Sequence, residues 1–221
     1  DAPLAARMPF GLLLALVLVL VWYATFQLAR TEAAQPVAFA FGGEAKPKDY
    51  ARTIADGAVL ALIACLGLTL LSHEASPILT QLAFVSCAFY GVAALPYHPR
   101  YSLTALCIGL LGLCLSGAPS FAVLMAIGSG FLCLLDRQST TAKTGRMHAL
   151  LLLAMGSIVM VLATALDVWH WRLRPVHNEW QEWRGLLRLI AWFTWPAWPL
   201  AVWTLWRWRR QWTSLHWSRH L

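Results

Sequence analysis

Long apolar runs separated by short polar segments make up most of this 221-residue chain. Hydrophobic residues are 59% of the sequence and charged residues only 12%, a balance far from that of soluble domains. A helix needs about 20 residues to cross a hydrocarbon core about 30 Å thick. Seven runs approach or exceed that length: 9–29, 55–72, 78–95, 102–116, 119–135, 148–168 and 187–206. The sequence therefore predicts a membrane protein.

The predicted fold class is all-α. Backbone groups in lipid must bond within their own segment unless a β-barrel closes, and no alternating barrel pattern is present in the sequence. We expect one transmembrane helical domain over residues 1–221, a polytopic bundle of about seven membrane segments. The runs 102–116 and 119–135 are short, so they either span twice or form a re-entrant pair.

The basic residues indicate an orientation. A net charge of +7 would suggest nucleic acid in a soluble protein, but here the charges lie between apolar runs, and no nucleic-acid partner is expected. Twelve of the 17 Lys and Arg residues fall in 30–54, 96–101, 136–147 and 207–221. The positive-inside rule places these segments in the cytoplasm and the N-terminus on the opposite side.

The chain starts at Asp1 instead of a methionine, and no small-residue cleavage site follows its first apolar run. We expect a spanning helix there, not a signal peptide, and an internal fragment of a longer protein. The five cysteines all lie inside apolar runs, where no disulfide framework or metal-ligand spacing is visible. No metal ligands are predicted.

Two polar segments on the predicted outer side carry the candidate chemistry. In "LSHEASP", residues 71–77, His73 and Glu74 are either a proton-handling or metal-binding pair or ordinary loop residues. In "DVWHWRLRPVHNEWQEWRG", residues 167–185, Arg172, Arg174 and His177 lie among tryptophans. Arginine binds phosphate through a planar fork of donors, but arginine and tryptophan also anchor helices at a membrane boundary. Both interpretations stay open for both segments.

Tryptophan is concentrated in the last quarter of the chain, where twelve of the 13 lie between positions 169 and 217. The run 187–206 contains Pro196 and Pro199, which predict a kinked final spanning helix. Trp206 falls where an inner aromatic belt is expected. At mid-depth, Trp198 and Trp203 are predicted to line a lipid groove, together with Trp195.

Four stretches resemble one family: "PKDYARTIADGAVLALIACLGL", "SHEASPILTQLAFVSCAFYGVAALP", "LTALCIGLLGLCLSGAPSFAVL" and "LLRLIAWFTWPAWPLAVWTLWRWRRQ". They are similar to the proteobacterial membrane glycosyltransferases of family 39, which are related to the lipid A aminoarabinose transferase and to protein mannosyltransferases. The resemblance implies a GT-C fold in the inner membrane with a periplasmic active side. It implies a polyprenyl-phosphate sugar donor and a lipid or envelope-glycan acceptor.

The resemblance also implies roles for residues. The His-Glu pair of that family's outer loop matches His73 and Glu74, whereas its acidic catalytic residues would precede Asp1. Arg172 and Arg174, or a divalent metal ion, would stabilise the charge of the leaving phosphate. The alternative is a non-catalytic membrane subunit, scaffold or permease component, because the chain has no strong catalytic motif of its own.

Overall fold

The computed structural model describes residues 2–31, 34–35, 45–65, 68, 77–135, 142–169 and 180–209, and every regular element in them is helical. The helices are α1 (Ala2–Ala29), α2 (Pro47–Ile63), α4 (Pro77–Ala94), α5 (Pro99–Leu115), α6 (Pro119–Leu135), α7 (Ala142–Ala165), α8 (Trp180–Phe193) and α9 (Ala197–Trp208). The prediction of an all-α chain is confirmed for this part of the protein.

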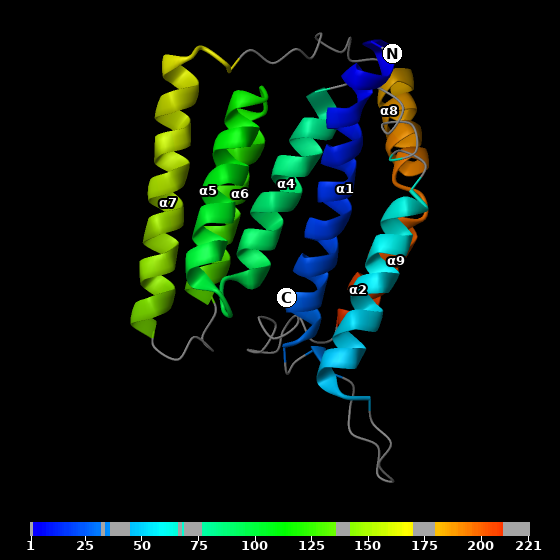
Figure 1. Ribbon diagram of the computed structural model, residues 1–221, viewed down its shortest axis with the longest axis vertical. Coiled ribbons are helices and arrows are strands. Elements are labelled where there is room, and N and C mark those ends of the chain that lie inside the picture. The colour runs from blue at the N-terminus through cyan, green and yellow to red at the C-terminus, as the bar shows by residue number, and fades with distance from the viewer. Residues whose placement is uncertain are drawn as a thin grey trace.

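The helices run up and down beside one another (Figure 1). α1 packs on α2 and on α4, α4 packs on α5, and α6 packs on α7. We call the end where α1, α4, α6 and α8 begin the N-terminal end, and the end where α2, α5 and α7 begin the basic end. The first six helices form the packed bundle, whereas α8 and α9 make few contacts with it.

Three of the described helices are long and apolar enough to cross a membrane: Met8–Ala29, Pro77–Ala94 and Gly145–Ala165. Pro99–Leu115 and Pro119–Leu134 are apolar but shorter. The run predicted at 55–72 is different, because α2 begins at Pro47, where a proline suits the first helical turn, and ends at Ile63. The seven-segment bundle is therefore not confirmed, although its membrane character is supported by the three spans.

The run 187–206 is not one spanning helix, and that prediction is wrong. α8 ends at Phe193 and α9 begins at Ala197. Pro196 lies in the break, where it has no backbone N–H to continue the helical ladder. The carbonyl of Thr194 accepts hydrogen bonds from the amides of Ala197 at 2.7 Å and Trp198 at 3.2 Å. Two short helices consequently replace the expected kinked one.

Small residues allow α4 and α5 to approach closely. A Cβ at Gly109 would lie 2.6 Å from the backbone nitrogen of Ala88, and one at Gly91 would lie 2.8 Å from the carbonyl oxygen of Ser102. A Cβ at Gly112 would collide with the ring of Phe84. Close backbone approach through glycine and alanine is how helices gain packing contacts in lipid, where no hydrophobic force draws them together. This seam fixes the centre of the bundle.

Candidate functional site

The N-terminal end of the bundle is built on a tight connection between α5 and α6. Gly117 takes a positive φ of 84°, which glycine adopts without a steric penalty. The amide of Ala118 donates to the carbonyl of Leu113 at 2.9 Å, the pattern of a helix closed by a left-handed residue. Gln81 of α4 donates from Nε2 to the carbonyl of Ser116 at 2.9 Å. This hydrogen bond connects the turn to α4, a third helix.

α7 ends in the same way beside this turn. Asp167 takes a φ of 53°, a conformation that Asp tolerates better than most residues. The amide of Val168 donates to the carbonyl of Ala163 at 3.0 Å. The indole Nε1 of Trp169 donates to Oγ1 of Thr164 at 3.1 Å. The chain therefore leaves α7 in a defined direction at Trp169.

The predicted site residues, His73, Glu74, Arg172, Arg174 and His177, all lie outside the described residues. The helices that flank them are described. α4 begins, α7 ends and α8 begins at the N-terminal end, and α2 runs toward it (Figure 1). The described helix ends that flank the second polar segment, and the start of α4 after the first, therefore lie at one end of the bundle.

Metal-ligating side chains do not gather elsewhere in the described part of the chain. No group of three or more His, Cys, Asp or Glu residues in those ranges is placed to hold a metal ion. No disulfide joins the cysteines of these ranges.

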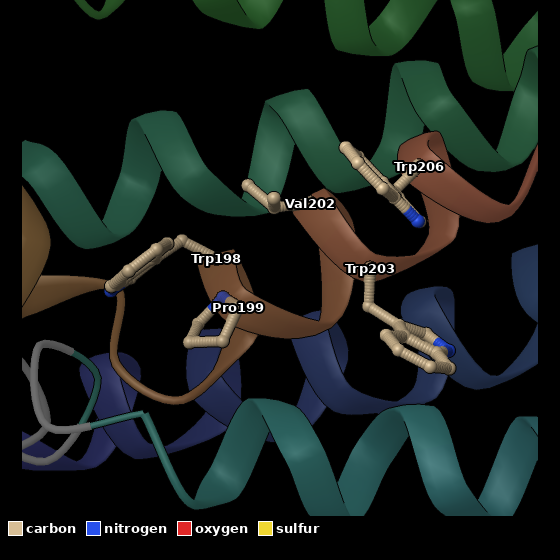
Figure 2. Close-up of a pocket in the computed structure, with 5 residues that line it drawn as sticks. All are labelled: Trp198, Pro199, Val202, Trp203 and Trp206. Atoms are coloured by element: carbon tan, nitrogen blue, oxygen red, sulfur yellow. The ribbon is translucent and has the colours of Figure 1, made fainter. Parts of the chain in front are cut away.

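An open apolar groove of about 350 Å³ runs along α9. Its lining residues are Trp198, Pro199, Val202, Trp203 and Trp206. Figure 2 shows these side chains following one another along the helix, with Val202 and Trp206 projecting to one side and Trp203 to the other. Trp203 and Trp206 are 62% and 63% exposed, so broad indole surfaces face outward.

The groove has a cation at one end. The guanidinium of Arg209 lies 4.0 Å from the centre of the Trp206 ring. Its Nη1 donates to the carbonyl of Trp206 at 3.0 Å. At the other end, the rings of Trp195 and Trp198 meet edge to face at 6.2 Å between centroids. Three indoles, a proline and a valine therefore line the groove, and the guanidinium of Arg209 lies beside its last indole.

Of the three tryptophans predicted to line a groove, the structure places Trp198 and Trp203 in it and Trp195 beside it. Pro199, Val202 and Trp206 were missed. The sequence contains a signal for two of them, because positions 198, 202 and 206 repeat at the spacing of one helical face. The sequence analysis instead assigns Trp206 to an aromatic belt that anchors the helix.

α8 adds a second feature, which the sequence analysis includes only in part, because Arg184 belongs to the segment 167–185 and Arg188 does not. Arg184 and Arg188 are four residues apart, so they lie on one face of the helix. Leu187 and Leu189 are exposed beside this face, and Trp192, four residues after Arg188, is exposed on it, all at 60% or more. An amphipathic helix with arginines and tryptophans suits a headgroup region. An arginine face thus immediately precedes the apolar groove in the chain.

In comparisons with protein families, with curated proteins and with solved structures, no match to this chain was found. The functional interpretation therefore depends on the residue geometry and on the sequence stretches quoted above.

Proposed function

We propose that the chain is part of a membrane glycosyltransferase of the bacterial inner membrane. It would transfer a sugar from a polyprenyl-phosphate donor to a lipid or envelope-glycan acceptor on the periplasmic side. The observation that carries the proposal is the open groove along α9. Apolar exposure alone is ordinary for a helix in lipid, so the proposal depends on the groove that the side chains of α9 form together.

The groove suits a long isoprenoid tail. An apolar tail that is already in lipid gains no transfer free energy by moving onto a protein, so recognition depends on close contacts with a shaped surface. Tryptophan supplies large, rigid apolar faces for such contacts. Three of them, Trp198, Trp203 and Trp206, line one groove. Branched methyl groups of an isoprenoid would fit between these rings.

The arginine face of α8 supports the same class of ligand. A polyprenyl-phosphate sugar combines an apolar tail with an anionic head. Arg184 and Arg188 lie in the helix directly before the groove, and guanidinium groups bind phosphate oxygens through paired donors. The ligand's two chemical parts therefore correspond to the two consecutive helices.

The reaction would be a displacement at the anomeric carbon. An acceptor hydroxyl forms the new glycosidic bond, the bond from the anomeric carbon to the phosphate oxygen breaks, and the hydroxyl proton passes to a general base. His73 and Glu74 are proposed for proton handling. Arg172, Arg174 and His177, or a divalent metal ion, would bind the phosphate as its charge develops.

The test is transfer by the native protein in lipid vesicles, with a radiolabelled polyprenyl-phosphate sugar as donor. Glu74→Gln and His73→Ala should each lower the rate by about a hundredfold or more, the usual contribution of a general base. Asp49→Asn is the matched control. Asp49 lies at the basic end in an exposed ion pair with Arg52 at 3.4 Å, and such pairs contribute little.

Two outcomes would contradict the proposal, the first for its residues and the second for its function. If both variants transfer sugar at the wild-type rate, His73 and Glu74 have no part in the chemistry. If the native protein transfers no sugar from any polyprenyl-phosphate donor tested, the non-catalytic membrane subunit becomes the better function.

A further inference from the structure

The basic end of the bundle contains an arginine held from three sides. The guanidinium of Arg30 lies 5.5 Å from the ring centre of Phe26 and 4.7 Å from that of Tyr97. Its Nη1 donates to Oε1 of Gln27 at 3.1 Å. Gln27 is only 5% exposed, so its amide is a fixed partner. Arg30 itself is exposed, and its orientation is set by these three neighbours.

The neighbours of Arg30 are themselves anchored. Tyr97 lies in the turn after α4, where its amide donates to the carbonyl of Ala94 at 3.0 Å. Phe26 stacks on Trp22 with 5.3 Å between ring centroids. The indole of Trp22 donates to Oδ1 of Asp56 in α2 at 2.7 Å. The guanidinium is thus positioned by α1, by α2 and by the turn between α4 and α5.

Among the described residues, Arg30 donates to a single side chain, which leaves most of its donors for another group. A guanidinium has five N–H donors, and the bond to Gln27 uses one. No carboxylate in the described ranges forms an ion pair with Arg30. An oriented, planar fork of donors fits a phosphate better than a flexible lysine does.

The surroundings of Arg30 favour an anion that comes from the membrane. Described basic residues gather at this end of the bundle: Arg30, Lys46, Lys48, Arg52, Arg100 and Arg146. Only Asp49 and Asp56 oppose them among the described residues of the same helix ends. Arg30 directly follows the apolar span Met8–Ala29, a position at the level of lipid headgroups.

From this geometry we propose that Arg30, positioned by Phe26, Gln27 and Tyr97, binds the phosphate group of an anionic phospholipid at the basic end. The aromatic rings hold the guanidinium plane, and the phosphate oxygens accept from its outward donors. Basic clusters beside a span attract anionic lipids in general. The Arg30 site differs because its donors are fixed in place. This inference does not depend on the transferase proposal.

Native mass spectrometry of the intact protein, released from nanodiscs with phosphatidylglycerol, measures the retained lipid. Arg30→Gln should weaken retention about ten- to a hundredfold, the range for hydrogen bonds to a charged group. Arg30→Lys should recover little of it, because lysine lacks the planar fork. Arg146→Gln is the matched control, since it removes the same charge from α7 at the same end. It weakens only the general charge attraction, so it should lower retention far less than Arg30→Gln.

A second variant covers the case in which Arg30→Gln fails to fold. Tyr97→Leu keeps every charge but removes a ring that holds the guanidinium, and it should weaken retention severalfold. Equal losses in Arg30→Gln and Arg146→Gln would overturn the proposal in favour of diffuse charge attraction, as would full retention in Arg30→Lys. Inorganic phosphate is the remaining probe. If it binds the lipid-free protein through Arg30 as tightly as phosphatidylglycerol does, the site serves a free phosphate and the lipid assignment is wrong.

Discussion

Substitution of Gly109 by alanine should destabilise the bundle, although alanine favours a helix. The added Cβ would lie 2.6 Å from the nitrogen and 2.8 Å from the Cβ of Ala88, and 2.8 Å from the carbonyl oxygen of Phe84. Comfortable contacts between carbon atoms are about 3.5–4.0 Å, so α4 and α5 must separate by roughly 1 Å. Two of the three atoms belong to the backbone and cannot rotate away.

Two effects of opposite sign compete in this variant. Overpacking costs about 1–3 kcal/mol, and backbone collisions belong to the upper half of that range. Higher helix propensity returns about 1 kcal/mol at most. We therefore expect the free energy of unfolding to fall by about 1–2 kcal/mol. Gly128→Ala in α6 is the matched control, because nothing lies within 4 Å of its Cβ and only the propensity gain applies.

Thermal unfolding in a mild detergent measures the difference between the two variants. The expected gap of about 2–3 kcal/mol corresponds to roughly 4–12 °C in Tm for a chain of this size. The Tm of Gly112→Ala should lie between those of Gly109→Ala and Gly128→Ala, because the Phe84 ring that the new Cβ meets can rotate away. Equal Tm values for Gly109→Ala and Gly128→Ala would refute the close approach of α4 and α5.

Three other predictions follow from contacts in the described helices. Asp56→Ala should lower the free energy of unfolding by about 1 kcal/mol, because the hydrogen bond to Trp22 is lost. A double-mutant cycle with Trp22→Phe should show that the two changes are coupled, and strict additivity would contradict the bond. Gly117→Ala should cost about 1–2 kcal/mol in chemical unfolding, because alanine is strained at a φ of 84°, and an unchanged midpoint would contradict that backbone. Burial raises the pKa of Tyr97, so its protonated phenol stabilises the fold below the ordinary tyrosine pKa of about 10. This stabilisation is lost as pH rises above that value. Tyr97→Phe should therefore flatten the decline in Tm at alkaline pH, and an unaltered slope would exclude Tyr97 as its source.

Helix positions were predictable where an apolar run has a proline at its start. α4, α5 and α6 begin at Pro77, Pro99 and Pro119, within a few residues of their predicted starts. Proline suits a first turn, so hydropathy and local chemistry agree there. At Pro196 they disagree, because the apolar run continues through 187–206 whereas proline interrupts the helical hydrogen bonds. The break between α8 and α9 follows from that conflict.

The placement of the helix ends that flank the two polar segments was predictable. Hydropathy and charge are enough to put these helix ends on one side of the bundle, since this needs only the alternation of the spans. The clamp on Arg30 was not predictable, because Tyr97 is distant in sequence and meets the guanidinium only after α1 packs on α4. The close seam at Gly109 likewise depends on which face of α5 meets α4. Contacts between helices are decided by packing, which a single sequence does not display.

The most direct test of the account is the binding of a polyprenyl phosphate to the native protein in nanodiscs. Trp203→Ala removes an indole from the groove, whereas Trp192→Ala removes an indole outside the groove lining that is equally exposed, at 62%. Loss of one aromatic anchor typically costs more than 1 kcal/mol, so Trp203→Ala should weaken binding about tenfold or more. Trp192→Ala should bind like the wild type. Equal affinities for the two variants, or no binding by the wild type, would contradict the claim that α9 forms the wall of a lipid-substrate site.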